Sequence, residues 1–157
     1  RSSGLSSSTR AVRLGGRGPT SAYQDTIDFA TISTTGNYTD FGNLSTAAAD
    51  GSACSNSTRG IYFSGYSGSY TNVIEYIQIA TTGNAVDFGD QLANKAYGTA
   101  VSSPTRAVNM GGFDSPAATN VIEYVEIATT GNAVDFGDID TGTLQSGGGT
   151  SNGHGGL

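Results

Sequence analysis

Short apolar segments alternate with Gly-, Ser- and Thr-rich segments along the whole chain, and one apolar phrase occurs three times. The phrase occupies 26–43, 73–90 and 121–138. Its central glycines are 47 and 48 residues apart, at Gly36, Gly83 and Gly131. A period of this length is typical of architectures in which each repeat is one supersecondary unit stacked on its neighbours. The pattern therefore predicts about three stacked units.

Within the phrase, apolar residues occupy both faces of a strand. In the third copy, Val121, Val125 and Ile127 lie on one face together with Glu123, while the residues between them include Ile122 and Tyr124. A strand that is apolar on both faces is covered on both. We therefore expect each sheet to lie between two neighbouring sheets.

The residues around this strand predict antiparallel partners for it. A Gly-Asn dipeptide follows the strand in every copy and predicts a hairpin turn, at Gly36-Asn37, Gly83-Asn84 and Gly131-Asn132. A second phrase precedes the strand at 6–16, 55–65 and 102–112, and it reads as a strand that ends at glycine. Each unit is predicted to contain three clear strands and a fourth short one, with no helix.

These observations divide the chain into one repeat array, 1–157. The predicted units cover 5–53, 54–100 and 101–149, and 150–157 reads as the first strand of a fourth unit, because SNGHGGL aligns with SNSTRGI at 55–61. An array of this kind leaves an apolar sheet face open at each end. Either the sequence is a fragment of a longer chain or partner copies cover these faces, and we expect assembly with other copies of the chain or with a larger particle.

Charge and composition restrict the classes of partner. The formal net charge is −6 and 13% of the residues are charged. An acidic chain is poorly suited to contact phosphates, so neither a nucleic acid nor an anionic membrane surface is expected as a partner. No run of about 18 apolar residues is present, so no membrane insertion is expected.

Charged residues recur at matching positions of the units. Three arginines lie in register at Arg10, Arg59 and Arg106, and one acidic position recurs as Asp28, Glu75 and Glu123. An acid on a largely buried face needs a partner. The interpretation favoured by the sequence is one structural Arg–carboxylate ion pair per unit. The alternative is a ring of charges that binds a ligand.

No catalytic residue, cofactor or metal site is predicted. Cys54 reads as a small buried apolar residue rather than a reactive thiol. Pairs such as Asp135 and Asp138 fit turn capping better than calcium binding, which needs more oxygen ligands. The single histidine, His154, lies in a glycine-rich segment with no Ser/Asp constellation around it.

The segments between the strands are the candidate recognition loops. They carry aromatic residues at Tyr23, Tyr62, Tyr66, Tyr70 and Phe113. Aromatic side chains on Gly/Ser-rich loops can stack on sugar rings or contact proteins. The alternative is that they cap the edges of the sheets.

The repeat resembles the kelch repeat of β-propellers. The features that match in the third unit are Arg106, Gly111-Gly112, Tyr124, Gly131-Asn132 and Phe136. Two departures exist: Val134 and Phe136 lie where kelch units commonly carry a Trp, and the second unit has Ser64-Gly65 in place of a double glycine. The resemblance implies an all-β fold of tandem four-stranded antiparallel blades.

The amino-acid sequences of the units are also similar to those of kelch-like arrays in virion proteins of marine tailed phages, especially phages of cyanobacteria. That resemblance covers nearly the whole chain and implies a non-enzymatic virion component, in a tail fibre or on the particle surface, located in the virion or outside the cell. Other copies of the chain or other virion proteins are the expected partners, and a host surface glycan is a further candidate through the aromatic loops. The alternative is a carbohydrate-binding adhesin or lectin module of a bacterial surface. An enzyme on a propeller scaffold is disfavoured, because no convergent catalytic set can be named.

Overall fold

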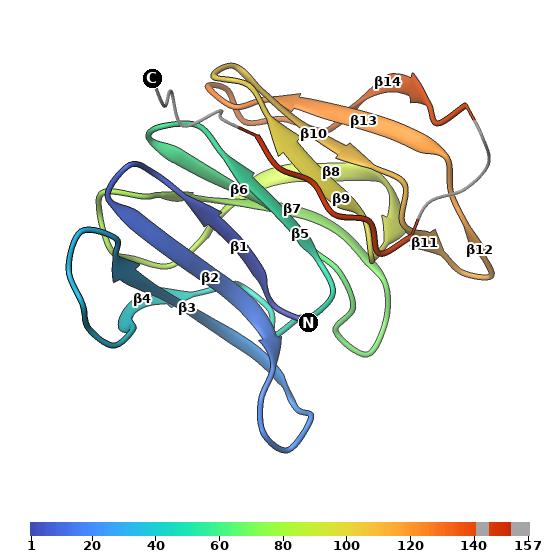
Figure 1. The fold of residues 1–157 in the computed structure, drawn as a ribbon. Helices are drawn as coiled ribbons and strands as arrows, with labels where there is room; N and C mark the ends of the chain where they lie inside the picture. The colour runs from blue at the N-terminus through green and yellow to red at the C-terminus, as the bar shows by residue number, and fades with distance from the viewer. Residues whose placement is uncertain (141–144, 152–157) are drawn as a thin grey trace.

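The protein is all-β. In a computed structural model, which describes residues 1–140 and 145–151, these residues form strands, turns and loops, and none of them lies in a helix (Figure 1). The predicted all-β, antiparallel character of the chain is confirmed.

Each of the three predicted units is one four-stranded antiparallel sheet whose strands pair in chain order. Unit 1 contains β1 (Ser3–Ser6), β2 (Arg10–Arg17), β3 (Tyr23–Thr31) and β4 (Thr39–Asn43). Unit 2 contains β5 (Ser52–Ser55), β6 (Arg59–Phe63), β7 (Thr71–Gln78) and β8 (Val86–Lys95). Unit 3 contains β9 (Thr99–Ser102), β10 (Arg106–Met110), β13 (Val121–Glu126) and β14 (Val134–Asp138). A small hairpin, β11 (Phe113–Asp114) with β12 (Ala117–Ala118), follows β10. The fourth short strand expected in each unit is therefore the first one, next to the preceding unit.

The units begin slightly earlier than the sequence indicated. Their first strands start at Ser3, Ser52 and Thr99, two residues before the predicted boundaries at 5, 54 and 101. The reason is that pairing begins before the first apolar residue of the strand. In unit 2, Cys54 lies opposite Ile61, and Ser52, two residues earlier, still lies opposite Phe63.

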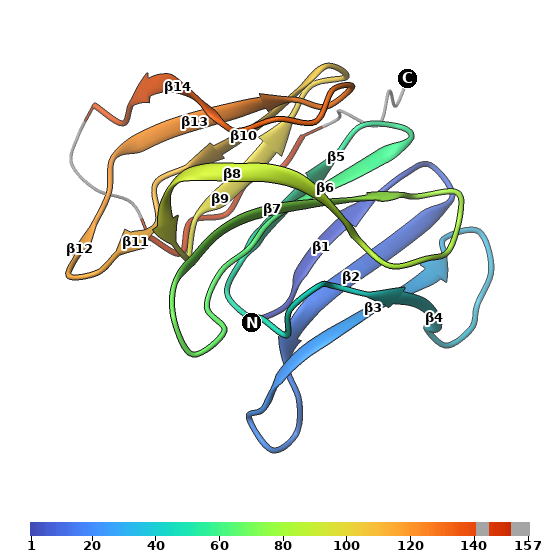
Figure 2. The ribbon, with the colours of Figure 1, turned by 180° about the vertical axis from the view of Figure 1, so that it is seen from behind.

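The first strands of successive units lie side by side, as both views show (Figures 1 and 2). Backbone hydrogen bonds link them at one shared position: Asp50 N donates to Arg1 O over 3.1 Å, and Tyr97 N donates to Asp50 O over 2.7 Å. Ser146 N continues the series by donating to Tyr97 O over 2.7 Å. Asp50, Tyr97 and Ser146 also share a φ of 62°. The chain therefore enters a fourth first-strand position at Ser146, whereas 152–157 of the predicted strand lie outside the described residues.

The hydrophobic core is divided between the spaces that separate consecutive sheets. Between units 1 and 2 it contains Leu5, Val12, Leu14, Ile27, Phe41, Leu44, Tyr62, Ile77 and Ile79. Between units 2 and 3 it contains Cys54, Ile61, Phe63, Ile74, Phe88, Ala100, Ala107, Val125, Ile127 and Ala133. Unit 2 contributes one face to each cluster, which confirms that the middle sheet is covered on both sides.

Candidate functional site

Four aromatic side chains form one continuous row that crosses all three units; Tyr23 and Phe113 begin strands, and Tyr66 and Tyr70 lie between strands. Tyr23 of unit 1 packs edge-on against Tyr66 of unit 2, with ring centroids 5.8 Å apart. Tyr66 packs edge-on against Tyr70 at 5.0 Å, and Tyr70 lies 5.7 Å from Phe113 of unit 3. Every ring is half-buried, so part of each remains open to solvent. We call these four residues the aromatic row.

A groove adjoins the end of the aromatic row at unit 3. Its volume is about 310 Å³, and it is lined by Tyr70, Tyr97, Phe113, Gln145 and Ser146. Tyr97 was missed by the sequence analysis because it lies just before a strand and not in a variable loop. Burial raises the pKa of the Tyr97 hydroxyl, and the Asp50 carboxylate adds to the rise.

At the other end of the aromatic row a cation covers the ring. The Arg17 guanidinium lies 4.6 Å from the centroid of Tyr23 and donates a hydrogen bond to its hydroxyl over 3.2 Å. Such a cation–π contact holds the ring in place. The row therefore combines apolar ring surfaces with hydroxyl groups and one cation, which is the chemistry of a surface that contacts sugars or protein.

Tyr62 does not belong to this surface. Its side chain is 1% exposed and lies in the core between units 1 and 2. Burial, followed by the charges of Glu75 and Asp50, raises the pKa of its hydroxyl. The interpretation of Tyr62 as a recognition residue is therefore wrong, because Tyr62 lies inside the strand β6 and points into a core that only the neighbouring sheet creates.

The second recurring feature is the contact between consecutive units, which we call joint 1–2 and joint 2–3. In both joints the loop that contains the Gly-Asn dipeptide pairs with the outer strand of the preceding unit. In joint 1–2, Gly83 N donates to Phe41 O over 2.7 Å and Ala85 N donates to Asn43 O over 2.9 Å. In joint 2–3, Gly131 N and Ala133 N donate to Phe88 O and Asp90 O, both over 2.7 Å.

The asparagine of the same dipeptide completes this pairing. Asn84 Oδ1 accepts a hydrogen bond from Asn43 N, and Asn132 Oδ1 accepts one from Asp90 N, both over 3.0 Å. The Gly-Asn dipeptides were predicted as hairpin turns, and they do lie in the loops between the third and fourth strands. What the sequence did not indicate is that in units 2 and 3 these loops also bind the preceding unit.

Glycine at the outer strand allows the loop to approach. Gly42 and Gly89 adopt φ values of 150° and 146°, and a Cβ on either would collide with the carbonyl group of Gly83 or Gly131. Both glycines lie beside a β-bulge in the pairing of the third and outer strands. Gly42 lies opposite Ile27, where the register shifts between Ile27 and Asp28, and Gly89 lies opposite Ile74, where it shifts between Ile74 and Glu75. A bulge of this type bends the strand and favours glycine.

The recurring acid of units 2 and 3 also reaches across the joint. Glu75 Oε1 accepts a hydrogen bond from Ser45 N over 2.8 Å, and Glu123 Oε2 accepts one from Leu92 N over 2.9 Å. Burial raises the pKa of Glu75, and the hydrogen bonds from Ser45 lower it in part. The acid therefore satisfies a backbone N–H group of the preceding unit, after the strand β4 in unit 1 and within the strand β8 in unit 2.

The predicted ion pairs Arg10–Asp28, Arg59–Glu75 and Arg106–Glu123 are wrong. Side chains alternate between the faces of a strand, and each acid lies opposite the residue three positions after the arginine, so arginine and acid lie on opposite faces. Those opposite residues are Arg13, Tyr62 and Asn109. In unit 1 this produces a different ion pair, in which Arg13 donates to both oxygens of Asp28 over 2.9 and 2.6 Å.

The recurring arginines instead bind the following unit. Arg10 Nη1 donates to Ile79 O over 2.7 Å, and Arg59 Nη1 donates to Ile127 O over 2.6 Å. Each guanidinium also lies over an aromatic ring of its own sheet, 4.4 Å from the centroid of Phe29 or Tyr76.

Arg106 has a different partner, because unit 3 is the last described sheet. Its Nε donates to Glu126 over 2.7 Å, and its guanidinium lies 4.6 Å from the centroid of the Tyr124 ring.

Joint 2–3 contains a buried polar cluster at the position where joint 1–2 has Tyr62 and Leu44. Lys95 Nζ lies 3.0 Å from Glu123 Oε1, and both side chains are almost fully buried. Asn109 Nδ2 donates to Glu123 Oε1 and to Gln91 Oε1, and Ser52 Oγ donates to Asn109 Oδ1 over 2.9 Å. This cluster consists of Ser52, Gln91, Lys95, Asn109 and Glu123.

Cys54 lies in the apolar part of the same joint. Its side chain is buried, and burial raises the pKa of the thiol to about 12, with a smaller opposing contribution from a hydrogen bond with Ser102. The prediction of a buried, apolar cysteine is confirmed. The folded protein holds this thiol protonated at neutral pH, so its reactivity reports opening of joint 2–3.

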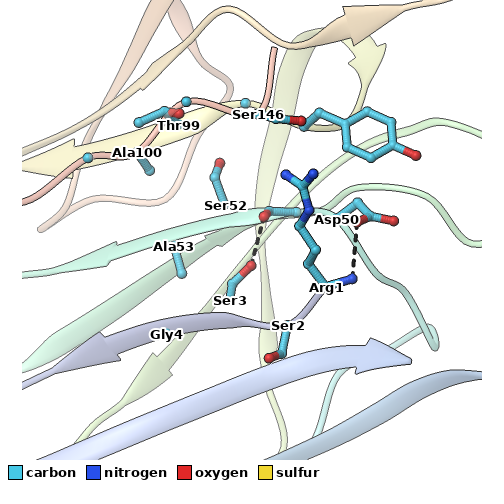
Figure 3. Close-up of a pocket in the computed structure, with 15 residues that line it drawn as sticks. Arg1, Ser2, Ser3, Gly4, Asp50, Ser52, Ala53, Thr99, Ala100 and Ser146 are labelled. Atoms are coloured by element: carbon cyan, nitrogen blue, oxygen red, sulfur yellow. Dashed lines mark hydrogen bonds and ion pairs between the residues drawn. The ribbon is translucent and has the colours of Figure 1, made fainter. Parts of the chain in front are cut away.

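A polar pocket of about 200 Å³ lies between the first strands of the three units (Figure 3). Small residues line most of it, and two of its hydroxyl groups are engaged, whereas the buried Thr99 Oγ1 has no hydrogen-bond partner among the described residues. Ser3 Oγ donates to Gly51 O over 2.7 Å, and Ser52 Oγ donates to Asn109 Oδ1. Asp50 accepts a hydrogen bond from the Arg1 amino group over 3.1 Å. The pocket thus offers hydroxyl and backbone groups but no paired base and nucleophile.

Other chemistry is sparse in the part of the chain that the structure describes. Residues 1–140 and 145–151 contain no group of three or more His, Cys, Asp or Glu side chains placed to hold a metal ion. Asp135 Oδ1 accepts a hydrogen bond from Gly137 N over 3.1 Å within the strand β14. His154 lies outside the described residues. Within the described ranges, no helix is long and apolar enough to span a bilayer.

Comparisons with known proteins add no family to these observations. No family model matches the chain, and no curated protein matches its sequence. The joints and the aromatic row are therefore the features from which a function can be inferred.

Proposed function

We propose that this chain is a non-enzymatic structural protein of a virion, in a tail fibre or on the particle surface. In this proposal the three sheets are kelch-like propeller blades that act as a scaffold and present the aromatic row to the host surface. The observation that carries the proposal is the pair of matching joints. Two sets of backbone hydrogen bonds join the loops to the outer strands, and they bind each unit to the next through a surface of fixed geometry.

The difference between the joints and the aromatic row supports the scaffold role. The joints use the same glycine, asparagine, arginine and glutamate contacts at matching positions, whereas the segments that carry the aromatic row differ between units in length and composition. A binding surface on variable loops held by a rigid scaffold is a common arrangement in recognition proteins. Other copies of the chain or other virion proteins are the partners of the scaffold, and the proposed location is the virion or the extracellular space.

The test is to search for the chain in purified particles. Mass spectrometry of marine tailed-phage virions that encode this sequence should detect its peptides, and gold-labelled antibodies should bind at ordered positions on the tail or particle surface. Peptides that occur in the infected-cell lysate but are removed by purification of the particles would contradict the proposal.

The second candidate function is binding of a carbohydrate by an adhesin or lectin module, and the aromatic row favours it. Aromatic rings that run 5.0 to 5.8 Å apart beside a groove with tyrosine hydroxyl groups could stack on sugar rings. Glycan-array binding should fall at least about tenfold in the variant Tyr70→Ala, because loss of one good contact of about 1.4 kcal/mol changes affinity by that factor. Tyr38→Ala is the matched control, since Tyr38 is exposed and lies outside the row.

Glycan binding and virion incorporation are separate measurements. Specific, Tyr70-dependent glycan binding by a chain that is absent from particles would favour the adhesin. Binding that survives both substitutions equally would remove the aromatic row from either function.

A further inference from the structure

The outer surfaces of units 1 and 3 are the two separate halves of the joint that occurs twice inside the chain. Within the joints, the loop isoleucine is buried, with Ile79 and Ile127 each 1% exposed, whereas the matching Ile32 of unit 1 is 55% exposed. The outer-strand phenylalanine shows the reverse pattern. Phe41 and Phe88 are each 3% exposed, whereas Phe136 of unit 3 is 55% exposed. Each end therefore exposes the group that the joint buries.

The loop of unit 1 already has the conformation of the loops that bind. Ile32 N donates to Thr9 O over 2.9 Å, as Ile79 N does to Thr58 O and Ile127 N does to Thr105 O. A turn follows in all three loops, in which Thr34, Thr81 and Thr129 donate to residues 31, 78 and 126. Gly36 and Asn37 therefore hold the same position in the loop of unit 1 as Gly83 and Asn84 hold in the loop of unit 2, which binds unit 1.

The edge of unit 3 is equally prepared to accept a loop. A bulge between Ile122 and Glu123 matches the bulges of units 1 and 2, and Gly137 has a φ of 141°, close to the values of Gly42 and Gly89. No atom lies within 4 Å of a Cβ built on Gly137, whereas the same position in units 1 and 2 is occupied by the incoming loop. The side chains of Val108, Met110 and Ile122 on this face are only half-buried, although their equivalents in units 1 and 2 are fully buried.

We propose that unit 3 of one molecule binds unit 1 of a second copy of the same chain, with the loop 32–38 of the second copy on the strand β14 of the first. The inference rests on the assembly role proposed above and names its partner. The internal joints identify the occupant of the unit 3 edge. In them an outer strand like β14 binds a loop of the kind that unit 1 leaves exposed. A contact between two different surfaces of one chain is heterologous, so it produces a closed ring or an open fibre.

The charges of the unit 1 face do not prevent this contact. Arg13 and Asp28 neutralise each other through two hydrogen bonds. Joint 2–3 already buries an ion pair of this kind, Lys95–Glu123. Asp28 is held by Arg13, so it does not offer its carboxylate to a backbone N–H group as Glu75 and Glu123 do. The contact between copies therefore has one hydrogen bond fewer than the internal joints, and we expect it to be reversible.

Association is tested by sedimentation velocity on the full chain over a range from about 1 µM to about 1 mM, which covers the dissociation constants of weak to moderate complexes. The weight-average mass of the wild type should increase with concentration. Phe136→Asp and Ile32→Asp should each abolish the increase, because each places a charge in one half of the contact. Val86→Asp is the control, since Val86 is an exposed apolar residue of unit 2 that lies on neither end.

Mixing the two defective variants tests the head-to-tail arrangement itself. Phe136→Asp retains an intact unit 1 loop and Ile32→Asp retains an intact unit 3 edge, so an equimolar mixture should form dimers and nothing larger. Gly137→Ala gives an independent check, because a methyl group there blocks the incoming loop but touches nothing in the isolated chain. Circular dichroism of every variant establishes that it is folded.

Three outcomes would overturn the inference. The first is a wild type that stays monomeric over the whole range, and the second is association that Phe136→Asp or Ile32→Asp leaves unchanged. The third is a variant mixture that stays monomeric while the wild type associates, because one intact unit 3 edge and one intact unit 1 loop would then not be sufficient for the contact. Virion incorporation and glycan binding are measured separately, so failure of self-association is distinguishable from failure of the proposed function.

Discussion

Joints 1–2 and 2–3 share one backbone arrangement but differ in the side chains that they bury. Both hold a Gly-Asn loop on a glycine-containing outer strand, and both place an arginine on a carbonyl group of the following unit. Joint 1–2 fills the centre with Tyr62 and Leu44, whereas joint 2–3 fills it with the Lys95–Glu123 ion pair and two amides. The joint therefore depends on the backbone and the glycine, while its interior tolerates either apolar or polar groups whose hydrogen bonds are satisfied.

The largest effect is expected from the glycines that both joints share. Gly42→Ala and Gly89→Ala place a methyl group against a carbonyl of the neighbouring loop and also strain the backbone. Each should lower the free energy of unfolding by more than about 4 kcal/mol, a loss that single substitutions rarely reach. Gly137→Ala has similar backbone strain without the collision and should cost about 1–3 kcal/mol. Urea unfolding measures all three, and equal losses would show that the loop contact contributes nothing.

The next effect should distinguish the joints. Lys95→Met leaves the Glu123 carboxylate buried without its cation, and such a change costs about 3–5 kcal/mol. Joint 1–2 contains no comparable pair, so the substitution should loosen joint 2–3 alone. Cys54 lies in joint 2–3 and should therefore react faster with a thiol reagent at neutral pH in the variant than in the wild type.

The double variant Lys95→Met/Glu123→Gln is the matched control for the ion pair. It removes both charges and keeps an oxygen for Leu92 N, so most of the stability and the slow reaction of Cys54 should return. A single variant that is as stable as the wild type would show that the pair is not needed in joint 2–3.

A smaller effect is expected at the asparagines. Asn84→Ala and Asn132→Ala each remove one hydrogen bond from a joint and should cost about 1 kcal/mol. Asn37→Ala, at the matching exposed position of unit 1, should change thermal stability by less than about 0.5 kcal/mol. A comparable loss in Asn37→Ala would mean that the asparagine stabilises its own loop and not the joint.

The smallest effect is a pH dependence at joint 1–2. Burial raises the pKa of Glu75 above its ordinary value of 4.5, so the folded state binds the proton more tightly than the unfolded state. The resulting stability is fully present below that ordinary pKa and is lost as the pH rises through the raised pKa. Glu75→Gln should flatten this decline in urea-unfolding curves, whereas Asp114→Asn, at an exposed carboxylate that does not contribute to the pKa of Glu75, should not. Parallel curves for the wild type and Glu75→Gln would contradict the assignment.

The sequence by itself determined the number of units, the strand pattern and the positions that recur. Local alternation of apolar residues and the Gly-Asn dipeptides were sufficient, because strand faces and turns depend on neighbouring residues. The aromatic row was also partly visible. Four of the five aromatic residues predicted for recognition belong to it, and these four lie in segments that the sequence marks as variable.

Only the tertiary structure decided what the recurring residues contact. Arg10, Glu75 and Asn84 all bind a different unit, through partners 30 to 69 positions away along the chain. No local pattern encodes such a contact, because the backbone groups involved carry no sequence signal. For the same reason Tyr62 read as a surface residue until the neighbouring sheet was placed over it, and Ile32 and Phe136 read like their buried equivalents although they lie on open faces.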